Sequence, residues 1–387
     1  MKAAGYALIL ISALNAAAGT TACPPAPRPG DPLRGLTAEE LARFEAGREV
    51  FEREFTPETG LGPLFNSVAC GECHEAPVAG GSGDEVEAHV AALRPDGFCD
   101  PLVGRGGPVI QQLATPALKA ALGIDGEPIP AEATGIARRS SPDVFGFGLL
   151  DAVPEAAILA LADPEDRNHD GISGRPNRFF DGRLGRFGRK AIVPTLREFN
   201  LGAFVIEMGI TNPAAPSEES IGGQPIPDGV DPLPEPELNE REANLADDFV
   251  RFLAPPRLLP LDREGERGRI IFGTIGCGGC HVPSLTTGDH PVRALRFKRV
   301  DAYTDLLLHD MGPEGADICL GLASPSEFRT EPLMGLRLME FFMHDGGATT
   351  VEEAIERHGG EGAAARDRFR RLRPPERGAV LKFLKAL

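Results

Sequence analysis

The sequence contains no tryptophan and only two tyrosines among 387 residues, so its 21 phenylalanines supply almost all of the aromatic mass. Basic residues are also scarce: 40 Lys and Arg face 57 Asp and Glu, which gives a formal charge of -17. A chain this acidic repels phosphate and has no basic run to offset the charge, so we expect no nucleic-acid binding. Disorder is excluded as well, because 42% of the residues are hydrophobic, enough for packed cores.

Long hydrophobic runs are missing except at the N-terminus. After Met1 and Lys2, residues 3–18 are almost entirely apolar or small. This run is short for a bilayer span of about 20 residues and typical of a signal peptide. We therefore expect residues 1–22 to be a signal peptide of an exported, periplasmic protein with no transmembrane span in the mature chain. Cys23 either carries a lipid anchor or belongs to a soluble cleaved form, and an uncleaved N-terminal helix is a further alternative.

Cysteine is rare but patterned. Four of the seven cysteines fall in two copies of Cys-x-x-Cys-His, at 70–74 and 277–281. In this motif the two thiols add to the vinyl groups of haem, and the adjacent histidine reaches the iron. A thioredoxin-like pair or a zinc site is the alternative, but no βαβ setting is visible for the former. The sequence predicts two covalently bound haem c groups, held by Cys70, Cys73 and His74 and by Cys277, Cys280 and His281.

Helical patterns surround both motifs. A capping box at 37–40 opens the first helical period, and apolar helices are predicted at 244–253 and 376–387. The pattern Gly-Arg-x-(Val/Ile)-Phe occurs at 47–51 and again at 268–272, which indicates an internal repeat. We expect a mainly α fold of two tandem cytochrome c-like helical domains, each with one covalent haem, and irregular loop-rich insertions. The predicted boundaries are a Pro-rich linker at 23–36, an N-terminal haem domain with an insertion at 37–257, and a C-terminal haem domain at 258–387.

Further segments resemble a known family. Three of these segments precede the second motif: Gly-Leu-Gly-Pro-Leu-Phe-Asn at 60–66, Arg-Phe-Gly-Arg-Lys at 186–190 and Gly-Ala-Phe-Val-Ile-Glu-Met-Gly-Ile-Thr-Asn at 202–212. Four more follow the second motif, at 303–313, 328–333, 344–346 and 358–360. From about residue 36 to the C-terminus, this order resembles the bacterial di-haem oxidoreductases, described as peroxidases or thiol oxidoreductases. More distantly, the chain is similar to di-haem cytochrome c peroxidases and MauG-type enzymes. The resemblance implies one haem that handles electrons and another that meets oxidant.

The resemblance also implies a distal ligand for the C-terminal haem. Peroxidase relatives carry this ligand fourteen positions after the histidine of a His-Asp-Gly segment. Here the segment begins at His344, so the expected ligand is His358. A surface role for His358 is the alternative, and the other candidate ligands are Met334, Met339, Met343 and Tyr303.

The N-terminal haem has two candidate partners. Glu207 matches the active-site glutamate of peroxidase relatives and would move a proton beside an open iron; an ion-pair or capping role is its alternative. His89 lies fifteen residues after His74, near the place of a detachable distal histidine, and is otherwise a solvated helix residue. The chain departs from the relatives in having no tryptophan between the haems and in having Phe199 in a segment that usually carries glutamine.

Two other features lie outside the haem motifs. Residues 166–177 follow the spacing of a calcium loop, with Asp166, Asn168, Asp170 and the carbonyl of Ile172 as candidate ligands and a plain Asx turn as the alternative. Cys99 and Cys319 remain after haem attachment and form either a disulfide or two separate buried thiols.

Two functions fit these features. The first is an oxidoreductase in which electrons pass to an N-terminal haem that reduces peroxide or another small oxidant. The second is a non-catalytic di-haem electron carrier. Under both, the acidic surface predicts a small basic redox protein or cytochrome as the electron partner.

Overall fold

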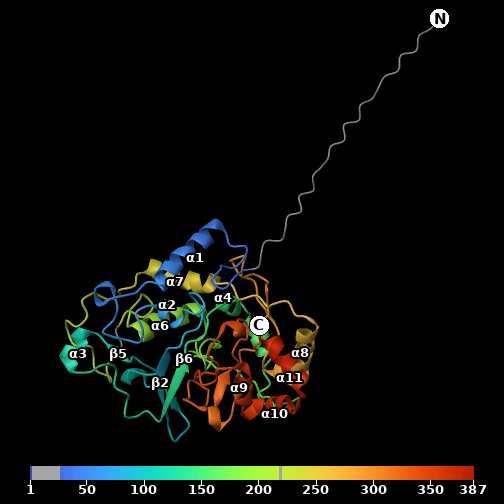
Figure 1. Ribbon diagram of the computed structural model, residues 1–387. Helices are drawn as coiled ribbons and strands as arrows, with labels where there is room; N and C mark the ends of the chain where they lie inside the picture. The colour runs from blue at the N-terminus through green and yellow to red at the C-terminus, as the bar shows by residue number, and fades with distance from the viewer. Residues whose placement is uncertain (2–26, 218–219) are drawn as a thin grey trace.

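The computed structural model describes residue 1 and residues 27–217 and 220–387 (Figure 1). Apart from Met1, the predicted signal peptide lies outside these residues, as does Cys23. Within the described ranges, no helix is both long and apolar enough to cross a membrane.

Helices frame each Cys-x-x-Cys-His motif. Those of the N-terminal half are α1 (Ala38–Phe51), α2 (Cys70–Cys73), α3 (Pro116–Leu122), α4 (Phe147–Asp151), α5 (Glu155–Leu159), α6 (Leu196–Met208) and α7 (Glu240–Phe252). Those of the C-terminal half are α8 (Arg263–Thr274), α9 (Val351–Glu356), α10 (Ala363–Arg371) and α11 (Pro374–Leu384). The capping box predicted for the first helix is present, because Thr37 and Glu40 each accept the other's backbone N–H.

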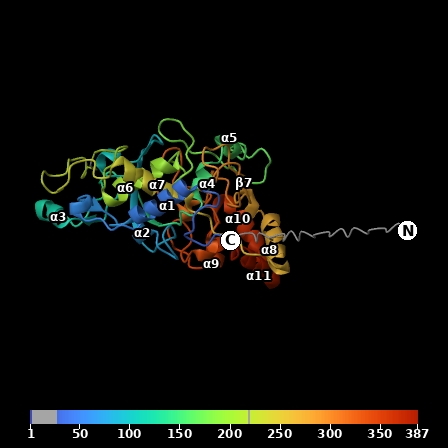
Figure 2. The same ribbon diagram turned by 90° about the horizontal axis from the view of Figure 1, so that it is seen from above.

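A closely packed helix pair occurs in each half. α1 lies along α7, and α8 lies along α11 (Figures 1 and 2). Both pairs meet at the glycine of the repeated Gly-Arg-x-(Val/Ile)-Phe pattern: a Cβ on Gly47 would lie 2.0 Å from the Leu245 carbonyl oxygen, and one on Gly268 would lie 1.9 Å from that of Ala379. The two copies of the predicted repeat therefore fold alike.

The expectation of a mainly helical chain is only partly met, because residues between α2 and α4 form a sheet. Its central strand β2 (Val86–Leu93) pairs antiparallel with β6 (Gly135–Ser140) on one side and with β3 (Cys99–Asp100) and β4 (Val109–Ile110) on the other. Three two-stranded ladders accompany it: β1 (Leu64–Phe65) with β5 (Leu113–Ala114), β7 (Leu285–Thr286) with β8 (Arg299–Val300), and β9 (Leu308–Asp310) with β10 (Glu327–Arg329). The fold is thus mixed, with helices and small sheets. The physical reason is long-range pairing, because β2 pairs with β6 at each residue from Val86 to Ala91.

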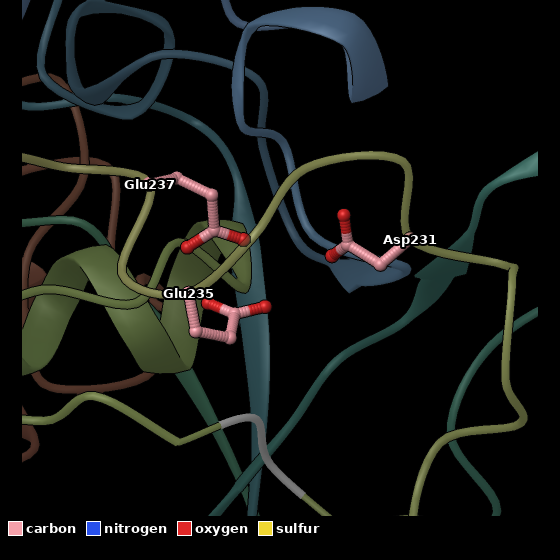
Figure 3. A group of neighbouring side chains, drawn as sticks. All are labelled: Asp231, Glu235 and Glu237. Carbon is pink, nitrogen blue, oxygen red and sulfur yellow. The ribbon is translucent and has the colours of Figure 1, made fainter.

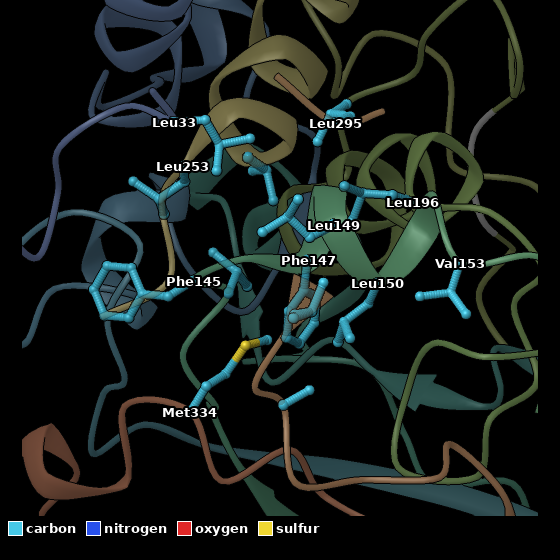
Figure 4. Packing of buried hydrophobic residues seen from close by; sticks show 14 of the residues in the cluster. Leu33, Phe145, Phe147, Leu149, Leu150, Val153, Leu196, Leu253, Leu295 and Met334 are labelled. Carbon is cyan, nitrogen blue, oxygen red and sulfur yellow. The ribbon is translucent and has the colours of Figure 1, made fainter. Parts of the chain in front are cut away.

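The largest hydrophobic core joins the two halves (Figure 4). It packs α4 residues such as Phe147 and Leu150 with Phe249 of α7 and with Leu295 and Met334 of the C-terminal half. A second core lies within the C-terminal half and contains Phe272, Phe369 and Phe383, among others. Cys99 and Cys319 form a disulfide between β3 and the C-terminal half, which resolves the alternative left open by the sequence.

Candidate functional site

The first Cys-x-x-Cys-His motif is held on a single helical turn. α2 carries Cys70 and Cys73, and His74 follows it. The His74 Nδ1 lies 2.8 Å from the Pro142 carbonyl oxygen and 3.2 Å from that of Gly81. Burial lowers the pKa of His74, which favours the neutral imidazole. With Nδ1–H donated to a carbonyl, Nε2 carries the lone pair that a metal ligand needs.

The second motif repeats this arrangement. Cys277 lies in a 3-10 turn, and the Nδ1 of His281 lies 2.9 Å from the Tyr303 carbonyl oxygen. Burial lowers the pKa of His281 to about 4. The phenylalanine of each repeated pattern packs near the motif's histidine, with ring centroids 6.2 Å apart for Phe51 and His74 and 6.3 Å for Phe272 and His281.

A cavity of about 230 Å³ opens beside the second motif. Its apolar wall comes mainly from Phe272, Leu333, Leu336, Phe342, Ile355 and Phe369, and Cys277, Cys280 and His281 also line it. A mostly apolar space beside two thiols and a histidine fits the chemistry of a covalently attached haem.

The predicted distal ligand faces the same cavity. The rings of His281 and His358 are 6.4 Å apart between centroids. Two imidazoles that coordinate one metal ion from opposite sides at about 2.0–2.1 Å would have centroids about 6 Å apart. His358 donates through Nδ1 to the Ala354 carbonyl oxygen at 2.7 Å, so its Nε2 carries the lone pair that a metal ligand needs. The structure therefore brings His281 and His358 together across the cavity.

The four other candidate ligands lie in different places, and two of them line the cavity. Met339 and Met343 also line the cavity, whereas Met334 packs in the core shared by the two halves. Tyr303 packs its ring against Phe272, 6.2 Å between centroids, and uses its carbonyl oxygen to orient His281.

The motif cysteines have the character of buried thiols. Burial raises the pKa of Cys70, Cys73 and Cys277 to about 12, and it also raises the pKa of Cys280. Thiol–disulfide chemistry and zinc binding need thiolates, which these surroundings disfavour. Within the described residues, the side chains that lie close enough together to hold a metal ion are three carboxylates rather than cysteines.

Glu207 lies at the first motif in a chain of polar groups. It accepts a hydrogen bond from the Asn66 amide at 3.0 Å. Burial and the neighbouring Glu87 carboxylate raise its pKa well above the usual range. Glu87 in turn lies 3.1 Å from the Nε2 of His89 on β2. His89 is thus on a strand rather than a helix, and sequence reasoning missed Glu87, which no local motif marks.

Between the two motifs lies a group of buried charges. Arg189 and Arg329 line the cavity and share the Glu331 carboxylate, at 3.0 and 2.8 Å. Nearby, the Lys190 ammonium lies 3.6 Å from the centre of the Phe328 ring, which stacks on His344 at 4.2 Å. Positively charged side chains and a Phe–His stack therefore occupy this region.

A buried histidine lies beside the second motif. His309 has a carboxylate at each ring nitrogen: Asp305 is 2.8 Å from Nε2, and Glu361 is 2.7 Å from Nδ1. Burial alone would lower the pKa of His309, but hydrogen bonds with Asp305, Cys280 and Glu361 raise it to about 12. His309 was not singled out from the sequence, because two of its partners, Cys280 and Glu361, are 29 and 52 residues away in the chain.

The candidate calcium loop folds as a tight Asx-rich turn. The Asp166 carboxylate accepts the backbone N–H of Asp170 at 3.0 Å, and Asp170 accepts that of Ile172 at 2.9 Å and an amide hydrogen of Asn168 at 3.0 Å. The Ile172 side chain packs on the second motif, since a Cβ on Gly279 would lie 2.4 Å from its Cδ1.

A separate group of carboxylates lies in the segment that precedes α7 (Figure 3). Oxygens of Asp231, Glu235 and Glu237 come within 4.8 Å of one another, and the Thr211 hydroxyl donates to Glu235 and Glu237. Burial raises the pKa of Glu237 to about 7.

Comparison with known proteins identifies a family. The sequence model described as "Di-haem oxidoreductase, putative peroxidase" matches residues 132–387, a range that includes the second motif and begins after the first. No curated protein matches the chain.

Solved structures give distant likenesses. Hydrazine synthase of Kuenenia stuttgartiensis has a TM-score of 0.42 at 14% identity, over 99% of this chain and 100% of that one. A MauG-like protein associated with microbial copper homeostasis has a TM-score of 0.41 at 15% identity, over 95% and 94%. The diheme peroxidase BthA of Burkholderia thailandensis has a TM-score of 0.41 at 16% identity, over 89% and 86%. These likenesses are too distant to support an argument about this chain, but the family match covers well over half of it. The chain belongs to the di-haem oxidoreductase family.

Proposed function

We propose that the chain is an exported di-haem c-type cytochrome that accepts electrons at its C-terminal haem and reduces peroxide at its N-terminal haem. The observation that carries the proposal is the pair His281 and His358, 6.4 Å apart across an apolar cavity that also exposes Cys277 and Cys280. The two Cys-x-x-Cys-His motifs and the peroxidase description of the family support it.

The two motifs supply the residues that would hold each haem. Cys70 and Cys73 would attach the N-terminal haem, with His74 as its proximal ligand, and Cys277, Cys280 and His281 would do the same for the C-terminal haem. When bound, haem supplies an iron that exchanges single electrons and, where a coordination position is open, reacts with peroxide. The Pro142 and Tyr303 carbonyl oxygens fix the two proximal imidazoles in the tautomer that ligates through Nε2.

We assign the proton transfer to Glu207. Burial and the charge of Glu87 raise the pKa of Glu207, which favours the protonated carboxyl, so an Oε atom can donate a proton to a departing oxygen and later recover it. Asn66 holds the carboxyl in place at 3.0 Å. Glu87 stays ionised because His89 donates to it, and its negative charge helps to keep the proton on Glu207.

The second candidate function is a di-haem electron carrier with two ligands on both irons. His89 would then be the distal ligand of the N-terminal haem. The contact of His89 with Glu87, which occupies its Nε2, favours the peroxidase over the carrier.

The test is spectroscopic. The full-length protein, produced with its haem-maturation system, is examined by optical and electron paramagnetic resonance spectra when oxidised and half-reduced, with and without peroxide. We expect two haems per chain, one low-spin and one high-spin haem that reacts with peroxide. Two low-spin haems that peroxide leaves unchanged would replace the peroxidase by the carrier.

The domain division is part of the proposal. The helix pairs α1/α7 and α8/α11, each closed at a repeated glycine, support two cytochrome c-like units at 37–257 and 258–387. The sheet around β2 is an insertion in the first unit.

Export and the electron partner are also proposed. The Cys99–Cys319 disulfide supports an oxidising compartment, which we propose is the periplasm, with or without a lipid at Cys23. With a formal charge of -17, the chain should associate with a small basic redox protein or cytochrome, and the association rate should fall with added salt.

We further propose that Asp166, Asn168, Asp170 and the Ile172 carbonyl bind calcium. The alternation of oxygen side chains within one tight turn supports the proposal. Because this turn packs on the second motif, removal of calcium by a chelator should lower the melting temperature of the holoprotein, and added calcium should restore it. Equal melting temperatures with chelator and with calcium would show a plain Asx turn.

A further inference from the structure

His309 connects three parts of the C-terminal site that are distant in sequence. Its side chain is 3% exposed, and Asp305 and Glu361 occupy its two ring nitrogens at 2.8 and 2.7 Å. The Cys280 sulfur lies 3.5 Å from the same Nδ1 that Glu361 contacts. A histidine with a carboxylate at both nitrogens donates two hydrogen bonds and carries a positive charge. His309 is therefore a fixed cation between the haem-attachment motif and Glu361.

Glu361 is the anchor of a short segment that carries His358. Besides His309, it accepts the Ser173 backbone N–H at 2.9 Å, the Ser173 hydroxyl at 2.7 Å and the Asp310 backbone N–H at 3.2 Å. Its side chain is 12% exposed. A carboxylate with this many donors holds one position, because moving it would break several buried hydrogen bonds.

His358 itself lies in a short segment that contacts other parts of the chain: Arg366 donates to the His358 carbonyl oxygen at 2.9 Å, and an added Cβ on Gly359 would lie 2.5 Å from the Met311 carbonyl oxygen. His358 follows the end of α9, and two glycines at 359 and 360 separate it from Glu361. Glycine leaves the backbone many conformations, so the segment takes its position from contacts, among them those at its two ends. One end is the contact of His358 Nδ1 with the Ala354 carbonyl oxygen at 2.7 Å, and the other is Glu361.

We propose that His309 is a positioning residue that, through Glu361, fixes His358 at ligand distance from the haem attached at Cys277 and Cys280. The inference rests on the proposed function, in which His358 is the distal ligand. One imidazolium then sets the spacing between the attachment motif and the distal segment, since it contacts both Cys280 and Glu361.

Loss of the cation should release the distal segment. In His309→Gln, Asp305 and Glu361 would face one neutral amide, and the repulsion between the two buried carboxylates would no longer be balanced. His358 should then leave the iron for part of the time, and a free imidazole should be able to take its place.

The experiment compares variants of the full-length holoprotein. His309→Gln and Glu361→Gln test the contact. Ser173→Ala is the matched control, because it removes another partner of Glu361 and leaves the charges of His309, Asp305 and Glu361 intact. His358→Ala is the reference for a lost ligand. Electron paramagnetic resonance reports the spin state of the C-terminal haem, and optical titration with free imidazole reports access to its iron.

We expect His309→Gln to show a high-spin fraction at the C-terminal haem and to bind imidazole at a concentration at least tenfold lower than the wild type and Ser173→Ala require. Glu361→Gln, which keeps the side-chain shape, should change in the same direction and carries the test if His309→Gln fails to fold. A residue that only stabilises the fold would lower the melting temperature without changing the imidazole titration.

The outcomes separate the two proposals. A wild-type spin state and imidazole titration in both His309→Gln and Glu361→Gln, with a lost low-spin signal in His358→Ala, would overturn the role of His309 alone. An unchanged spectrum in His358→Ala would remove His358 as a ligand, and the role of His309 with it.

Discussion

Glu207 and Glu87 place two carboxyl groups beside the first motif, and their surroundings shift the two pKa values in opposite directions. Burial and the charge of Glu87 raise the pKa of Glu207, whereas hydrogen bonding and charge from His89 outweigh burial and lower the pKa of Glu87. Neighbouring carboxyls whose pKa values are pushed apart are a common basis for acid–base catalysis.

Replacing the proton donor should abolish turnover and leave the haems in place. We predict that Glu207→Gln lowers peroxide-dependent turnover about 10²–10⁴-fold, because glutamine keeps the shape of the side chain but cannot transfer a proton. The measurement is steady-state peroxide reduction with a reduced cytochrome as donor. Glu198→Gln is the control, since Glu198 lies on the same helix and pairs with Arg183 at the surface. Full activity in Glu207→Gln would assign the proton step to another group.

Glu361 should make the stability depend on pH in acid. Burial alone would raise its pKa, but hydrogen bonds from His309 and Ser173 lower it to about 2. A carboxyl whose pKa is lower in the folded state stabilises the fold above its unfolded value, and this contribution is lost as the pH falls from about 4.5 toward 2. We predict a steeper fall of the melting temperature over this range for the wild type than for Glu361→Gln, measured by scanning calorimetry. Parallel curves would contradict this prediction.

At the scale of elements, each half is closed by a helix crossing that leaves no room for a side chain. The Gly268 position on α8 lies against the backbone of α11, whereas Gly273 on the same helix has no atom within 4 Å of an added Cβ. Both glycines lie in the same helix, but an added Cβ would meet a neighbouring helix only at Gly268.

A matched pair of substitutions tests the crossing. Gly268→Ala should destabilise the protein, because its Cβ would lie 1.9 Å from the Ala379 carbonyl oxygen and the helices must separate. Gly273→Ala should stabilise it by about 0.5–1 kcal/mol, the usual gain from replacing glycine in an open helix position. Urea denaturation measures both, and equal effects would show that the crossing is loose.

The elements differ in how far the sequence could predict them. The helices next to the motifs were predictable because caps and periodicity are local signals, as at Thr37. β2 was not, since the alanine-rich stretch Val-Glu-Ala-His-Val-Ala-Ala-Leu has no strong strand propensity and becomes a strand through pairing with β6 about fifty residues later. The site residues differ in the same way, since some belong to local motifs and others meet only through long-range contacts. The Cys-x-x-Cys-His motifs are local, but the contact between His309 and Glu361 joins residues 52 apart.

At the scale of the whole molecule, the two haem-motif halves are packed into one body. Their shared core contains Phe147 and Phe249 from one half and Leu295 and Met334 from the other (Figure 4). Buried ion pairs add to it: Asp317 of the C-terminal half accepts from Arg139 at 2.8 Å and from Lys190 at 2.8 Å. Cys319 lies close to Asp317 in sequence, and its disulfide with Cys99 spans 220 residues.

This disulfide should stabilise the joined halves without affecting haem attachment. We predict that Cys99→Ala/Cys319→Ala lowers the free energy of unfolding by about 2–5 kcal/mol, because the unfolded chain regains the freedom that a long closed loop removes. Denaturation in urea measures the difference, and the haem absorbance per chain should equal that of the wild type, since both cysteines lie outside the attachment motifs. A reducing agent should destabilise the wild type and leave the double variant unchanged. If the wild type and the variant unfold at the same urea concentration, the shared core and the Asp317 ion pairs, rather than the disulfide, hold the two halves together.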